Sequence, residues 1–82
     1  MEEEVRTAEE IAKDYEAMGH SVELINGIID GSKMADESTE DKQDCVRRNK
    51  KHLELMVAKT DWGSEDMTSV NSAIASATTY LG

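Results

Sequence analysis

Apolar residues recur at spacings of three and four along most of this chain, and no other sequence feature limits the possible folds as strongly. Residues at these spacings lie on one face of an α-helix, so the pattern predicts an all-α protein. A first helix is expected from about Glu3 to Met18, with an apolar stripe of Val5, Ala8, Ala12 and Tyr15 flanked by Ile11 and Met18. A last helix is expected after Ser64, with a stripe of Met67, Val70, Ile74, Ala77 and Leu81.

Glycine and serine residues near the middle of the chain predict further boundaries. Gly19 is expected to end the first helix, and Ser21 is expected to cap a short segment over residues 22–30. Gly31 is expected to end that segment. Residues 22–30 are short enough to form either a helix or a strand, and the sequence leaves this choice open.

A further helix is expected from about Thr39 to Lys59, because Ser38 and Asp41 resemble a capping box in which Asp replaces Glu. Its inward residues are expected to be Cys45, Val46, Asn49, Leu53, Met56 and Val57. The predicted fold is therefore a single helical domain over residues 1–82, in the form of a helical hairpin or a bundle of three to four helices.

The size of the chain excludes several classes of function. With 82 residues, of which 38% are apolar, the chain builds a small core that does not enclose a substrate cavity. The sequence lacks a glycine-rich phosphate loop, a Gly-x-Ser-x-Gly elbow and a His-Glu-x-x-His pair. It also lacks a run of about 18 apolar residues, so no membrane span is expected. We therefore expect neither an enzyme nor a bound cofactor.

Charge is distributed unevenly along the chain, whose net charge is −9. Residues 1–44 hold 14 acidic and 4 basic residues, whereas residues 45–82 hold 4 acidic and 5 basic residues. The bases of the second half include a cluster of Arg47, Arg48, Lys50 and Lys51. These bases are expected to face solvent on a helix or to pair with the acidic half. The overall charge and the lack of interleaved aromatic residues disfavour nucleic-acid binding.

Cys45 and His52 lie two helical turns apart on the helix expected from about Thr39 to Lys59, and they are the candidates for a metal site. A structural zinc ion needs four ligands, and the paired short spacings of zinc modules are missing from the sequence. We therefore expect Cys45 to be a packing residue and expect no metal site.

The last predicted helix carries almost no charge beyond Asp66, and its second face is rich in serine and threonine. Small side chains of this kind allow a partner helix to pack closely. Trp62 is expected either to pack between the last two helices or to act as an interface hot spot. The candidate interface residues are Trp62, Val70, Ser72, Ile74, Ser76 and Tyr80.

The second half of the chain also shows a family resemblance. The pattern R-N-x-x-H-L-E-x-M spans residues 48–56, D-W follows at 61–62, and M-T-x-V-N-x-A-I spans 67–74, before a terminal Tyr80. This pattern resembles small proteins of tailed bacteriophages, especially those of marine cyanobacterial phages. The resemblance covers about residues 45–82 and implies a phage origin without implying catalytic residues.

Together these features favour a non-catalytic virion structural protein that contacts copies of itself or other virion proteins, as an oligomer or a heteromeric assembly. The alternative is an acidic regulator in the host cytoplasm that binds a basic site on a host nucleic-acid-binding protein.

Overall fold

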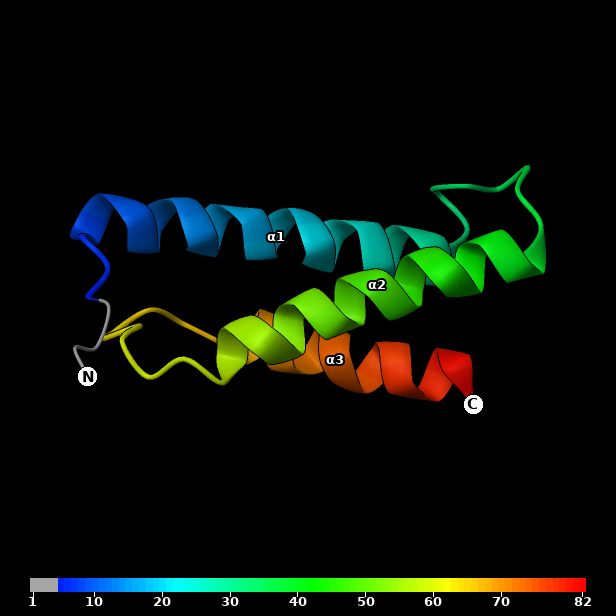
Figure 1. The fold of residues 1–82 in the computed structure, drawn as a ribbon. Helices are drawn as coiled ribbons and strands as arrows, with labels where there is room; N and C mark the ends of the chain where they lie inside the picture. The colour runs from blue at the N-terminus through cyan, green and yellow to red at the C-terminus, as the bar shows by residue number, and fades with distance from the viewer. Residues whose placement is uncertain (1–4) are drawn as a thin grey trace.

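The computed structural model describes residues 5–82, and these form a bundle of three α-helices without a strand (Figure 1). The helices are α1 (Ala8–Asp30), α2 (Thr39–Val57) and α3 (Thr68–Leu81). Each helix packs against the other two, and the bundle measures 44 × 23 × 17 Å. The predicted all-α bundle is confirmed.

Helix α1 is one continuous helix where the sequence predicted two segments. Gly19 and Ser21 lie in its interior, so the predicted stop and the predicted cap are both wrong. Residues 22–30 are therefore helical. The apolar face continues across Gly19, with Met18 and Ile25 both fully buried. Burial on both sides outweighs the roughly 1 kcal/mol by which glycine disfavours a helix interior.

The ends of α1 are set by local hydrogen bonds and by backbone conformation. Thr7 and Glu10 form a capping box, in which the backbone N–H of each residue donates to the side chain of the other. The helix thus starts at Ala8, later than the predicted start at Glu3, which lies outside the described residues. Gly31 ends the helix in the left-handed conformation (φ 86°), which confirms the prediction made for that residue.

The buried face of α1 differs from the predicted stripe. Val5, Ala8 and Ala12 are exposed. Of the predicted stripe, only Tyr15 packs against the core. The face turned toward α2 and α3 otherwise consists of residues that the prediction placed beside the stripe or in the next segment, namely Ile11, Met18, Ile25 and Ile28.

Helix α2 begins as predicted, whereas α3 begins later than predicted. Ser38 Oγ accepts a hydrogen bond from the backbone N–H of Asp41, which confirms the cap of α2. The predicted cap at Ser64 is wrong, because α3 starts at Thr68. The carboxylate of Asp66 accepts a hydrogen bond from the Thr68 backbone N–H and supports this start.

The core runs along the centre of the bundle and combines large side chains from two helices with small ones from the third. Helices α1 and α2 contribute large aliphatic residues, and α3 contributes Ala73 and Ala77 beside Val70. The small side chains of α3 allow it to approach the hairpin of α1 and α2 closely. Buried residues of the core are Met18, Ile25, Ile28, Val46, Leu53, Trp62, Val70, Ala73 and Ala77.

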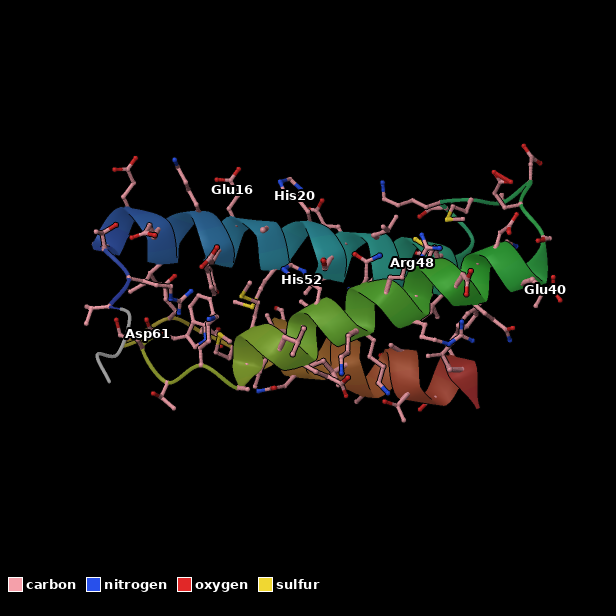
Figure 2. The ribbon with its side chains drawn as sticks, viewed as in Figure 1. Glu16, His20, Glu40, Arg48, His52 and Asp61 are labelled. Carbon is pink, nitrogen blue, oxygen red and sulfur yellow. The ribbon has the colours of Figure 1, made fainter. Side chains whose placement is uncertain are left out.

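One polar contact crosses this core between α1 and α2. Ser21 is 5% exposed, and its Oγ lies 2.8 Å from Nδ1 of His52. In Figure 2, His52 lies on the side of α2 that faces α1. The contact satisfies the buried hydroxyl of Ser21, which explains how a serine is accommodated inside the bundle.

Candidate functional site

The six predicted interface residues do not share one surface. Trp62 and Val70 belong to the core of the chain itself, with only 8% and 4% of their surface exposed. Ser72 and Ser76 are exposed on the outer face of α3, and Ile74 and Tyr80 are half-buried. The structure thus brings only part of the predicted set to a surface that a partner can reach.

The exposed part of that set adjoins a shallow groove between α3 and the end of α1. Ile29 lies on one side of the groove and is 41% exposed. The remaining lining residues come from α3 and are Ala75, Ser76, Thr79 and Tyr80. Helix α3 contains no Asp, Glu, Lys, Arg or His. The outer face of α3 and this groove therefore form one uncharged surface, which we call the α3 face.

The predicted basic cluster lies on α2, where three of its members form ion pairs with acidic residues of the same helix. Arg47 and Arg48 both reach Asp44, at 2.6 and 3.7 Å. Lys50 lies 3.8 Å from Glu54, and Lys51 is exposed. Exposed pairs one helical turn apart contribute little to stability. Their effect is to reduce the positive charge that this part of α2 presents.

Cys45 and His52 each bond to a neighbouring side chain. The Asn49 side-chain amide donates to the Cys45 carbonyl oxygen at 2.8 Å and lies 3.5 Å from its sulfur. His52 contacts Ser21 as described above. Among residues 5–82, no group of three or more His, Cys, Asp or Glu side chains is arranged to hold a metal ion.

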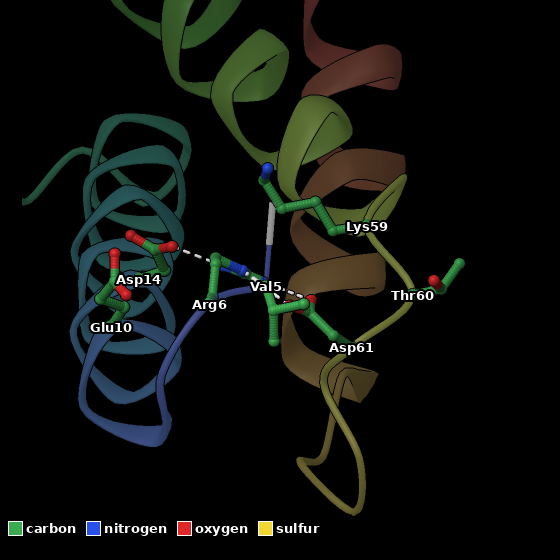
Figure 3. A pocket seen from close by; sticks show the side chains of 7 residues that line it. All are labelled: Val5, Arg6, Glu10, Asp14, Lys59, Thr60 and Asp61. Atoms are coloured by element: carbon green, nitrogen blue, oxygen red, sulfur yellow. Dashed lines mark hydrogen bonds and ion pairs between the residues drawn. The ribbon is translucent and has the colours of Figure 1, made fainter. Parts of the chain in front are cut away.

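A polar cluster that the sequence analysis missed lies at the opposite end of the bundle from the α1–α2 connection. Arg6 is its central residue, and only 10% of its side chain is exposed. Arg6 Nε donates a hydrogen bond to Asp61 Oδ2 at 2.9 Å, and Nη2 donates to Oδ1 of the same carboxylate. Arg6 Nη1 donates to Asp14 Oδ2 (Figure 3). The guanidinium thereby links α1 to the α2–α3 connection.

Two aromatic side chains complete this end of the bundle. The Arg6 guanidinium lies 4.5 Å from the centre of the Trp62 ring, a distance at which a cation is attracted to an aromatic face. The Tyr15 ring is 6.3 Å from that of Trp62, and the Tyr15 hydroxyl donates to the Asp66 carbonyl oxygen at 2.6 Å. The Trp62 indole N–H donates to the Met56 carbonyl oxygen. These contacts hold the α2–α3 connection against α1 and α2.

The ion pairs of this cluster change the proton affinity of its members. Hydrogen bonding from Arg6 holds the pKa of Asp61 below its ordinary value of 3.8. The hydrogen bond to Asp61 raises the pKa of Arg6 further above its already high value, and desolvation opposes this effect only in part. Arg6 and Asp61 are therefore both ionised at neutral pH.

We expect an Asp61→Asn variant to lose stability at neutral pH and to lose none in strong acid. Because the pKa of Asp61 is lower in the folded chain than in the unfolded one, its contribution is complete above the ordinary value of 3.8. The contribution disappears as the pH falls through the folded pKa. Urea unfolding between neutral pH and about pH 2 tests this expectation. Asp36→Asn, at an exposed position, is the control. A difference between wild type and Asp61→Asn that persists undiminished at the lowest pH would contradict it.

A shallow pocket that is open to solvent lies beside the Arg6 cluster, with a volume of about 590 Å³ (Figure 3). Its lining includes three carboxylates but, among the described residues, no histidine or cysteine. The lining residues are Val5, Arg6, Glu10, Asp14, Lys59, Thr60 and Asp61. Two of these carboxylates, Asp14 and Asp61, hold the Arg6 guanidinium, and the Glu10 carboxylate accepts a hydrogen bond from the Thr7 backbone N–H.

Comparison with known proteins gives no match, whether with protein-family models, curated proteins or solved structures. The resemblance of residues 45–82 to phage proteins therefore stays a prediction. Among the described residues, no helix has the length and apolar content needed to cross a membrane.

Proposed function

We propose that this chain is a non-catalytic protein that acts by binding other proteins through the α3 face, and that it is a small structural component of a phage particle. The supporting observation is the absence of charge on α3 in a chain where 33% of residues are charged. Ser72 and Ser76 are both exposed on this face. In a chain this rich in charged residues, a helix face that contacts only solvent is expected to carry charge.

The chemistry of the α3 face suits contact with another helix. Serine, alanine and threonine side chains lose little conformational entropy when ordered, and they let a second backbone approach closely. Ile29 and Tyr80 border the groove and add apolar area that a partner can bury. The phage assignment rests on the resemblance of residues 45–82, and the partners it implies are neighbouring copies of this chain or other virion proteins.

Placing glutamate at both Ser72 and Ser76 is expected to weaken assembly by at least about 100-fold, because each unpaired charge buried in a contact costs roughly 3–5 kcal/mol. The fold is expected to stay intact, since both positions are exposed in the isolated chain. Sedimentation over a concentration series, alone and with the other particle proteins, measures assembly, and far-UV circular dichroism measures folding.

Two control variants separate charge at the α3 face from other effects. Ser72→Gln with Ser76→Gln adds similar bulk without charge, and Ala12→Glu with Ala17→Glu adds the same charge to exposed positions of α1. Unchanged assembly of the glutamate variant would show that the α3 face is not the contact surface. Mass spectrometry of purified particles tests the virion role, which requires the chain to be present in stoichiometric copies.

The second candidate function is the acidic regulator, and one observation favours it. The acidic residues of residues 9–44 are exposed, apart from Asp14. Such a surface attracts a basic site on a nucleic-acid-binding protein, and the association is expected to weaken as salt is added. Salt-sensitive capture of a host nucleic-acid-binding protein, together with absence of the chain from particles, would favour this function over the first.

A further inference from the structure

The Arg6 guanidinium lies in a site whose other members come from separate parts of the chain. Asp14 belongs to α1, whereas Asp61 and Trp62 belong to the α2–α3 connection. Arg6 itself precedes α1 and lies outside the helices. The groups that surround the guanidinium thus come from α1 and from the α2–α3 connection, where Trp62 is buried in the core and bonded to the Met56 carbonyl oxygen. The segment that supplies the guanidinium precedes both of these elements.

The site matches the shape of a guanidinium group more closely than that of an ammonium group. Asp61 accepts two hydrogen bonds from adjacent nitrogen atoms, and Asp14 accepts a third from Nη1. The guanidinium carbon lies over the Trp62 ring, 4.5 Å from its centre. A planar group with donors fixed at its edge can satisfy all of these contacts at once, whereas a lysine ammonium cannot form the paired contact and stack in the same way.

Arg6 is held against the bundle by its side chain. The guanidinium makes three hydrogen bonds, while the backbone bonds that begin α1 start at Thr7. The neighbouring Val5 is 84% exposed. The pocket of about 590 Å³ beside the cluster is open to solvent, and its lining holds three carboxylates (Glu10, Asp14 and Asp61) and two cations (Arg6 and Lys59). When Arg6 leaves the site, negative charge is therefore in excess around it.

We propose that Asp14, Asp61 and the face of Trp62 form a recognition site for arginine side chains, which Arg6 occupies within the chain and which an arginine of a partner protein can occupy in its place. The site lies away from the α3 face and does not depend on the function proposed for that face. Because Arg6 is tethered close by, it competes with any external arginine at an effective concentration in the millimolar range.

The test uses the full chain with Arg6 replaced by alanine, and N-acetyl-arginine amide as the probe. Trp62 is the chain's single tryptophan, so its fluorescence reports directly on the site. We expect a saturable change in fluorescence and a raised melting temperature as the probe is added. N-acetyl-lysine amide is expected to bind roughly tenfold more weakly or worse, since it cannot form one of the paired charged hydrogen bonds. The intact chain is expected to need more arginine probe than the variant.

The double variant Arg6→Ala with Asp61→Asn is the matched control, and it is expected to lose the response. A folded Arg6→Ala variant without a saturable response would overturn the proposal, as would a response that Asp61→Asn leaves unchanged. If Arg6→Ala does not fold, Arg6→Lys keeps a tethered cation, and the arginine probe should displace it at lower concentrations than it displaces Arg6. Failure to displace it would also overturn the proposal.

Discussion

Replacing Leu53 with alanine is expected to lower the free energy of unfolding by about 2–5 kcal/mol, because the deleted atoms leave a cavity among buried neighbours. Leu53 lies on α2 and is fully buried within the core. The total stability of a small domain is about 5–15 kcal/mol, so this single change removes a large share of it. Urea unfolding followed by circular dichroism gives the difference.

Leu55 provides a matched control for that prediction. It lies two residues further along α2 and is 57% exposed. Leu55→Ala is therefore expected to change stability by no more than about 0.5 kcal/mol, as for other substitutions of exposed residues. Both variants delete the same atoms from the same helix. Equal losses of unfolding free energy in the two variants would mean that α2 does not turn Leu53 toward the core and Leu55 toward solvent.

Alanine at Gly19 and alanine at Gly31 are expected to have opposite effects on stability. Gly19 lies inside α1, where alanine is favoured over glycine by about 1 kcal/mol. Gly31 has a left-handed backbone (φ 86°), a conformation that costs an alanine roughly 1–2 kcal/mol. We therefore expect Gly19→Ala to raise the melting temperature and Gly31→Ala to lower it.

The two glycine positions are comparable because an added Cβ meets no atom within 4 Å at either one. Steric clash is thus absent from both, and the backbone angle alone sets the sign of the effect. Thermal unfolding of the two variants side by side measures it. A stabilised Gly31→Ala variant would contradict the left-handed end of α1, and a destabilised Gly19→Ala variant would contradict its continuity.

The sequence predicted the helical class well because helical spacing is a local property. The cap at Ser38 and the stop at Gly31 also depend on a few neighbouring residues, and both are confirmed. Gly19 shows where local reasoning fails. A glycine between two apolar stretches resembles a helix end, but the burial of Met18 and Ile25 against α2 and α3 decides the outcome.

The candidate sites were less accessible to sequence analysis, because they depend on contacts between distant residues. Arg6 and Asp61 are 55 positions apart, and an isolated base in an acidic segment has no pattern that identifies its partner. The exposure of Ile29 could not be predicted from the sequence either, because it depends on how α3 packs beside the end of α1. Ser72 and Ser76 are interface candidates that the sequence suggests directly, because the lack of charge around them is visible in the sequence itself.

The odd number of helices has a practical consequence for engineering this chain. The described chain enters the bundle at one end of its long axis and leaves toward the other (Figure 1). Fluorophores attached at Val5 and at Gly82, the two ends of the described chain, are thus held apart by the helices. A circular permutant would need a joining peptide that runs back along much of the bundle, whose full length of 44 Å takes about 13 residues at full extension.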